Sequence, residues 1–220
     1  LSYSNRSDEY HGLSIAGPNS RKVLEKIVRD DVSNEKFKFR DSRRMFVGGV
    51  PAIINRISFT GELGYEIYVA PHYQLKLYEE LMEAGKEFNI KPFGGRALMS
   101  MRLEKNWGAW TLDYRPDFTA KETGLDAFIN WDKEFIGKES AQKENSSNKL
   151  VPLIVETNEI DVTNNEAVLN GDQSIGYVTS GGFAHFVNKS VAFTFVDQKN
   201  IKSENKIQVE INGDLFNCSI

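Results

Sequence analysis

The chain has 220 residues, 40% of them hydrophobic and 26% charged, which is enough to bury a substantial core in one large domain or two smaller ones. Its formal net charge is -4, and Lys and Arg are scattered among Asp and Glu, so we expect no nucleic-acid partner. No apolar run approaches the roughly 20 residues of a membrane-spanning helix and the first residues do not resemble a signal peptide, so we expect no membrane partner and a cytoplasmic or mitochondrial-matrix location.

The first part of the chain predicts helices packed on a β-sheet. Residues 17–28 begin with helix-start signals and then place apolar residues at helical spacing. Residues 45–59 are rich in β-branched residues on both sides of a Gly-Gly pair, which predicts a hairpin. The stretch FTGELGYEIYVAP, residues 59–71, continues that sheet, and residues 72–88 have the apolar stripe of a surface helix.

A more apolar helix and an aromatic-rich loop follow. In residues 93–107, apolar side chains lie nearly all round the predicted helix, so we expect this helix to be enclosed. Its charged residues Arg96, Arg102 and Glu104 then need partners, because an unpaired buried charge is costly. Residues 107–131 are rich in aromatic side chains interrupted by Pro and Gly, which indicates a loop with short helical turns.

The last part of the chain predicts a small all-β domain. Residues 138–149 are polar and without apolar periodicity, which indicates a linker, and the SGGFAH stretch at 180–185 is predicted to be a barrel turn. Short β-like runs follow the linker, at residues 150–157, 173–182, 190–196 and 206–211. We therefore predict an α+β fold, with a mixed domain at residues 1–145 that is incomplete at its N-terminus and a β-barrel domain at residues 146–220 that is incomplete at its C-terminus.

Two carboxylates, Glu62 and Glu66, lie four residues apart on either side of the predicted strand start. Glu62 falls in the turn and is expected to be solvated, whereas Glu66 lies inside the strand at residues 65–69, on the face opposite the aliphatic side chains. A carboxylate there can accept two parallel hydrogen bonds from a planar ligand with adjacent N–H groups, such as a pterin or a guanine. The alternatives for Glu66 are an exposed sheet residue or an ion pair with Arg96 or Arg102.

Arg96 and Trp110 also fit a site for a planar ligand. Arg96 follows two glycines at the predicted helix start, where the backbone can approach a ligand closely. Its structural alternative is an ion pair with Glu104 or Glu66. Trp110 can stack on a flat ring, although tryptophans more often belong to the core.

The other reactive residue types indicate no catalytic or metal site. The single cysteine, Cys218, lies in a strand-like run near the chain end and is expected in the core or an edge strand. The three histidines are widely separated and lack metal-ligand spacing. No phosphate-binding loop, dinucleotide fingerprint, serine nucleophile elbow or zinc-protease motif occurs.

Four motifs in order resemble the aminomethyltransferase family, to which the T-protein of the glycine cleavage system belongs. They are SFTGELGYEIYV, GRALMSMRLEK, TGLDAFINWDKEFIGKESA and GYVTSGGFAHFVNKSVAFTFV. The sequence MRLEKNWGAWTLDYRPDFTAKETGLDAFI is more similar to the folate-binding C-terminal portion of dimethylglycine and sarcosine dehydrogenases than to the T-protein. The resemblance implies an aminomethyltransferase-like folate-binding domain followed by a small β-barrel.

The resemblance also implies tetrahydrofolate as the ligand and assigns three residues to its site. Glu66 matches the family glutamate that holds the pterin, and Arg96 matches the arginine at the head of the following helix. Trp110 matches an aromatic residue shortly after that helix and is a candidate for contact with the ring. These assignments agree with the expected bidentate acceptor and buried cation.

Parts of the family pattern have no match in this chain. The family's acidic residue that assists methylene transfer lies some tens of residues upstream of the Gly-Pro pair at residues 17–18, and Asp8 and Glu9 are too near that pair to replace it. The resemblance therefore implies no catalytic residue in this chain, which we expect to be inactive alone. FAD is expected only in an N-terminal half of a longer parent enzyme, and we expect the chain to be a fragment of that enzyme.

Three functions follow from this resemblance. The leading one is the tetrahydrofolate-binding, one-carbon-transfer portion of a dimethylglycine or sarcosine dehydrogenase, with a methylated glycine as substrate and an FAD-binding domain as partner. The first alternative is a fragment of a glycine-cleavage aminomethyltransferase. The second is a folate-binding protein without catalytic activity.

Overall fold

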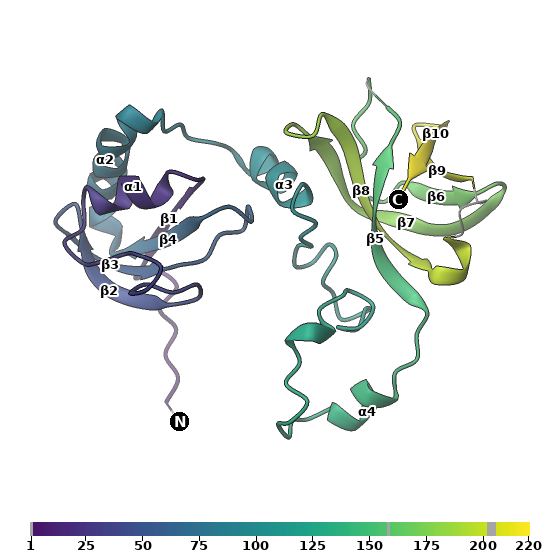
Figure 1. Cartoon of the computed structure of the whole chain (residues 1–220), viewed down its shortest axis with the longest axis horizontal. Coiled ribbons are helices and arrows are strands. Elements are labelled where there is room, and N and C mark those ends of the chain that lie inside the picture. Colours follow the sequence, from purple (N-terminus) through teal and green to yellow (C-terminus); the bar gives the residue numbers. More distant parts are fainter. Residues whose placement is uncertain (1, 158, 202–205) are drawn as a thin grey trace. The chain divides into compact units, whose positions relative to one another are not determined.

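The computed structural model describes residues 2–157, 159–201 and 206–220. The chain divides into two compact units, Leu1–Leu98 and Met99–Ile220, each of which is described by itself below (Figure 1). This division follows packing, whereas the predicted domains 1–145 and 146–220 follow the change from mixed to all-β sequence. The predicted domain boundary stays a prediction.

The first unit is a four-stranded antiparallel sheet with helices on one side (Figure 1). The strand order is β1-β4-β3-β2, with β1 at His11–Ala16, β2 at Ser42–Val47, β3 at Val50–Asn55 and β4 at Gly64–Val69. The helices are α1 at Ser20–Glu25, α2 at Gln74–Gly85, and the 3-10 turns Pro71–Tyr73 and Lys86–Phe88 that flank α2. The predicted hairpin, strand and surface helix are therefore confirmed.

The alternation of side chains along β4 decides which face of the sheet holds the core. Tyr65, Ile67 and Val69 are at most 1% exposed and pack against apolar residues of α1 and α2. Glu66 and Tyr68 are half-buried on the opposite, outer face. The sequence-based assignment of Glu66 to the face opposite the aliphatic side chains is thus confirmed.

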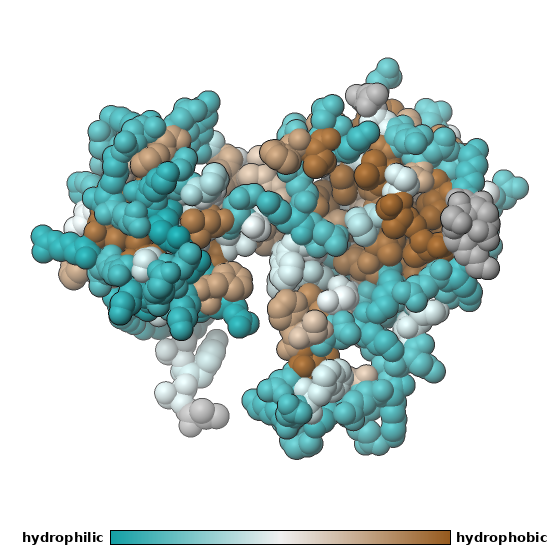
Figure 2. Space-filling model, viewed as in Figure 1, coloured by the Kyte–Doolittle hydropathy of each residue, from teal (hydrophilic) through white to brown (hydrophobic). Residues whose placement is uncertain are grey.

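The second unit contains a closed six-stranded barrel, as the sequence predicts (Figure 1). The strand order is β10-β5-β8-β7-β6-β9, with β5 at Asn148–Val155, β6 at Ala167–Asn170, β7 at Gln173–Ala184, β8 at Lys189–Asp197, β9 at Ile207–Ile211 and β10 at Asp214–Ser219, and a 3-10 turn at Gln198–Asn200 follows β8. Its core is aliphatic and includes Leu153, Val168 and Val209. Hydrophobic residues are also visible over the barrel strands on the face shown in Figure 2. The fold is therefore α+β with a terminal barrel.

Three expectations about the segments before and within the barrel need correction. The predicted linker contains a short helix, α4 at Lys138–Lys143, and runs directly into β5. The SGGFAH stretch lies mostly inside β7 and is no turn: a Cβ on Gly181 would come within 2.9 Å of two backbone oxygens, so this glycine permits a close approach of the chain. The helix α3 at Gly95–Leu103 is buried only in its last turn, at Arg102 and Leu103.

The aromatic-rich loop between α3 and α4 is irregular, as predicted, with one 3-10 turn at Asp126–Phe128. Glu122 fixes this loop to the start of β5. Its side chain accepts hydrogen bonds from the Thr119 backbone N–H at 2.9 Å and from the Ser146 hydroxyl at 2.6 Å, and its backbone oxygen accepts from the Leu150 N–H at 2.8 Å. Burial raises the pKa of Glu122, but the hydrogen bonds from Ser146 and Thr119 together outweigh it and lower the pKa below its ordinary value of 4.5.

No helix in the parts of the chain that the structure describes is long and apolar enough to span a bilayer.

A lowered pKa in the folded state means that Glu122 stabilises the second unit above pH 4.5 and that this stability is lost as the pH falls through the folded-state value. We expect Glu122→Gln to lower the free energy of unfolding by about 1 kcal/mol at pH 7 and by much less at a pH below the folded-state pKa of Glu122. Urea titrations followed by tryptophan fluorescence measure this, because all three tryptophans lie in the second unit. An equal loss at both pH values would contradict the assignment.

Candidate functional site

Glu66 lies in the middle of the outer face of the sheet, on the inner strand β4 between β1 and β3. Its Oε2 accepts a hydrogen bond of 2.8 Å from the Tyr68 hydroxyl two residues along the strand. This hydrogen bond, followed by burial, raises the pKa of Tyr68. Within the described part of the first unit, Tyr68 is the hydrogen-bond partner of the Glu66 side chain, so Oε1 and one lone pair of Oε2 can accept from a ligand.

Polar side chains flank Glu66 on both neighbouring strands. Ser14 of β1 and Asn55 of β3 are its in-register partners, and Ser42 of β2 continues the row opposite Asn55. In-register residues of adjacent strands share a face, with their Cβ atoms about 5 Å apart. Together these residues form a polar row, Ser42-Asn55-Glu66-Ser14, that crosses all four strands.

The period-two alternation of residues 65–69 predicts Tyr68 on the same face as Glu66, and the structure confirms this. Sequence reasoning missed Ser14 and Asn55 as neighbours of Glu66. The positions of Ser14 and Asn55 depend on strand order and register, which the chain order of the strands did not reveal. Glu62, the other carboxylate of this stretch, lies in the preceding turn, where it is half-buried and its N–H donates to the Thr60 hydroxyl.

Arg96, the second predicted site residue, is exposed in the first turn of α3. Gly94 and Gly95 before it leave open space, because a Cβ built on either would have no atom within 4 Å. Glu104, one of its two predicted structural partners, accepts a hydrogen bond of 2.8 Å from the Phe186 backbone N–H. Glu66 and Arg96 belong to the first unit and Trp110 to the second.

The predicted need of Arg102 for a partner is met by Asp113, which the sequence reasoning did not identify. Both side chains are fully buried, and Nη1 of Arg102 lies 2.7 Å from Oδ2 of Asp113. Asp113 also accepts hydrogen bonds from the Ala109 N–H at 2.8 Å and from the hydroxyls of Thr179 and Ser180 at 2.5 and 2.6 Å. Each carboxylate oxygen of Asp113 thus has two partners, and these contacts fix α3, the loop and β7 to one another.

This network holds the loop that presents Trp110. Nη1 of Arg102 donates to the Trp107 oxygen at 3.0 Å, and the Tyr114 hydroxyl accepts from the Gly108 N–H at 3.0 Å. The Trp110 ring contacts Tyr114 edge-on with a centroid distance of 6.1 Å, yet Trp110 is 77% exposed. Trp110 is therefore held at the surface of its unit, where its ring face can stack on a flat ligand.

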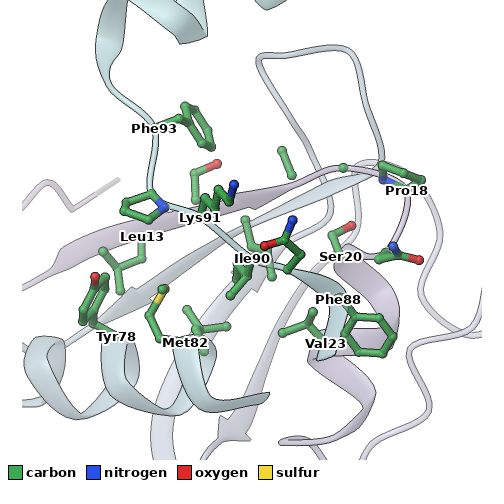
Figure 3. Close-up of a pocket in the computed structure, with 18 of the residues that line it drawn as sticks. Leu13, Pro18, Ser20, Val23, Tyr78, Met82, Phe88, Ile90, Lys91 and Phe93 are labelled. Carbon is green, nitrogen blue, oxygen red and sulfur yellow. The ribbon is translucent and has the colours of Figure 1, made fainter. Parts of the chain in front are cut away.

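A cavity of about 590 Å³ lies beside β1, between this strand, α1, α2 and residues 88–93 (Figure 3). Its walls are mostly apolar and include Leu13, Val23, Tyr78, Met82, Phe88, Ile90 and Phe93. Among the described residues that line it, Lys91 is charged and none is Asp or Glu, so it offers no carboxylate for adjacent N–H donors. Neither Glu66 nor Arg96 lines it, but Ser14 does, so the cavity reaches the β1 end of the polar row around Glu66.

Cys218 is half-buried in β10, and burial raises the pKa of its thiol to about 12, which does not suit a nucleophile. In the described ranges, no group of three His, Cys, Asp or Glu side chains could hold a metal ion.

Two family profiles match the chain. Residues 1–133 match the GCVT N-terminal domain, and residues 148–220 match the glycine cleavage T-protein C-terminal barrel domain. The first match covers more than half of the chain, and the second falls on the barrel.

Full-length relatives belong to two kinds of enzyme. Mitochondrial dimethylglycine dehydrogenase of Mus musculus is 35% identical, with 98% of this chain and 25% of the relative aligned. The aminomethyltransferase of Thermoanaerobacter pseudethanolicus is 32% identical, with 96% of this chain and 58% of the relative aligned. The crystal structure of aminomethyltransferase T from Bartonella henselae has the same fold, with a TM-score of 0.81 at 22% identity over 96% of this chain and 58% of that one. The chain thus spans a quarter to somewhat more than half of these relatives.

We expect Asp113→Ala to lower the free energy of unfolding of the second unit by about 3–5 kcal/mol, because it leaves the buried charge of Arg102 without a counter-ion. Among the described residues, Nε and Nη2 of Arg102 already lack hydrogen-bond partners, so these residues offer no spare acceptor. Tryptophan fluorescence during urea titration measures the unfolding of the second unit. Asp117→Ala is the control.

Asp117 also pairs with an arginine, Arg115, at 3.2 Å, but its side chain is 65% exposed, so its loss should cost less than about 1 kcal/mol. Similar losses in the two variants would show that the Asp113 network does not hold the unit together.

Proposed function

The chain belongs to the glycine cleavage T-protein family of aminomethyltransferases, and on this premise we propose that it binds tetrahydrofolate and serves in one-carbon transfer within a dimethylglycine or sarcosine dehydrogenase-like enzyme. The substrate of that parent enzyme would be a methylated glycine derivative. A cytoplasmic or mitochondrial-matrix location stays a prediction.

The observation that carries this proposal is the position of Glu66. It stands on an open sheet face, held by Tyr68 through one oxygen, with acceptor capacity left for adjacent N–H groups. The 2-amino-4-oxopyrimidine ring of a pterin presents two such N–H groups side by side, and charge-assisted pairs of this kind are short and strong. The hydrogen-bond acceptors of Glu66 therefore fit the ligand that the family implies.

The residues of this chain would bind and orient the ligand. Glu66 would fix the pterin by its N–H edge, Arg96 would supply positive charge and Trp110 a stacking surface. Tetrahydrofolate, when bound, supplies the amine that takes up the one-carbon unit as a methylene group. Holding this amine in place beside the incoming carbon would provide the proximity on which the transfer depends.

No residue of this chain is assigned to proton transfer or to FAD. The family's acidic residue has no match here, and the sequence contains no dinucleotide fingerprint. We propose that an FAD-binding domain of the same parent polypeptide performs the oxidation that delivers the one-carbon unit. In that arrangement the chain alone would bind folate without turning over a methylated glycine.

A glycine-cleavage aminomethyltransferase is the second candidate. The dehydrogenase and the aminomethyltransferase relatives are 35% and 32% identical to this chain, so identity does not separate the two candidates. The resemblance of MRLEKNWGAWTLDYRPDFTAKETGLDAFI to the dehydrogenases favours the first candidate. An FAD-binding fingerprint in the coding region upstream of Leu1 would support the dehydrogenase, whereas a nearby start codon would support a free-standing folate-binding protein without catalytic activity.

We expect Glu66→Ala to weaken tetrahydrofolate binding by about tenfold to a hundredfold, since hydrogen bonds to a charged group contribute about 1.5–3 kcal/mol. Isothermal titration calorimetry with tetrahydrofolate measures this on the unmodified chain and the variant. Glu62→Gln, in the turn four residues earlier, is the matched control and should leave the affinity within about twofold. Unchanged affinity in Glu66→Ala would refute the role of Glu66.

A further inference from the structure

The polar row on the outer face of the first unit offers hydrogen-bonding groups besides those of Glu66. Ser14 and Asn55 stand directly opposite Glu66 on β1 and β3. Within the described part of their unit, neither side chain has a hydrogen-bond partner. Because strands are spaced about 4.8 Å apart, the three residues form a line about 10 Å long with Glu66 at its centre.

The donors and acceptors of this line have a definite order. The amide of Asn55 can donate, the two oxygens of Glu66 accept, and the hydroxyl of Ser14 can donate. The order along the row is therefore donor, acceptor, acceptor, donor. One edge of a 2-amino-4-oxopyrimidine ring presents the complementary order: the carbonyl O4 accepts, N3–H and the 2-amino group donate, and N1 accepts.

We propose that Asn55 and Ser14 complete, with Glu66, a four-point site that reads the 2-amino-4-oxopyrimidine edge of the bound ligand. This inference rests on the proposed folate function, and it assigns specificity to two residues that the family resemblance did not identify. Asn55 donates to the carbonyl O4, and Ser14 donates to N1.

Burial decides which of the two residues discriminates between ligands. Asn55 is half-buried beside Ile53 and Glu66, whereas Ser14 is exposed near the free edge of β1. Water competes for the exposed hydroxyl of Ser14, so removing this hydroxyl changes the affinity little. Removing the half-buried amide of Asn55 leaves the ligand's acceptor without a hydrogen bond and partly shielded from water, which lowers the affinity. Asn55 is therefore the residue that distinguishes a carbonyl at position 4 from a poorer acceptor.

Calorimetric titrations of the intact 220-residue chain with tetrahydrofolate and with its 4-thio analogue test this. The thio analogue keeps both N–H donors but replaces the carbonyl oxygen by a weak sulfur acceptor. We expect the unmodified chain to prefer tetrahydrofolate about tenfold, and we expect Asn55→Ala to reduce this preference to less than about twofold. Ser42→Ala, which alters the same row one strand further from Glu66, is the control and should keep the preference.

The two proposals fail in different ways. If tetrahydrofolate binds and Glu66→Ala weakens it, but Asn55→Ala leaves the oxo-to-thio preference unchanged, the four-point site is refuted and the folate function stands. A preference lost in Ser14→Ala instead of Asn55→Ala refutes the assignment of the two donors.

Guanine presents the same edge, so guanosine and 6-thioguanosine form a second arm of the experiment. Tighter binding of guanosine than of tetrahydrofolate, with the preference still dependent on Asn55, would refute the folate function and retain the four-point site. Binding of neither ligand would refute both.

Discussion

The antiparallel pairing of β4 with β1 and β3 is the constraint on which the candidate site depends. It places Tyr65, Ile67 and Val69 in the core, and the same alternation forces Glu66 and Tyr68 onto the outer face. A slip of one residue would exchange the two faces, bury the carboxylate and expose the aliphatic side chains. The apolar core thus fixes the direction of Glu66 without contacting its carboxylate, and register alone gives Glu66 its polar neighbours.

A second constraint acts in the other unit, through the buried pair of Arg102 and Asp113. Two buried charges are costly to desolvate, and here the cost is offset by the ion pair and three further hydrogen bonds to Asp113. Their effect is geometric, since they tie α3 and the Trp110 loop to β7. An exposed tryptophan on a loop would otherwise lose much of its orientation, and with it any capacity to hold a flat ring.

The sequence revealed those features that depend on local pattern. Period-two alternation placed Glu66 on its face, and short β-branched runs separated by turn residues indicated the barrel. Features that depend on pairing between distant segments were missed, such as the register of Ser14 and Asn55 and the choice of Asp113 as partner of Arg102. Gly181 was mistaken for a turn residue, because a glycine that permits close backbone approach looks the same in sequence as one that permits a turn.

The proposed function depends on Glu66 holding the pyrimidine edge of tetrahydrofolate on the outer face of the sheet. A crystal structure of the chain with tetrahydrofolate tests this most directly. We predict that both oxygens of Glu66 lie within about 2.9 Å of the ring N3 and the 2-amino nitrogen, with Asn55 beside the carbonyl. A pterin bound elsewhere, for instance between α1, α2 and residues 88–93 in the apolar cavity, would contradict it.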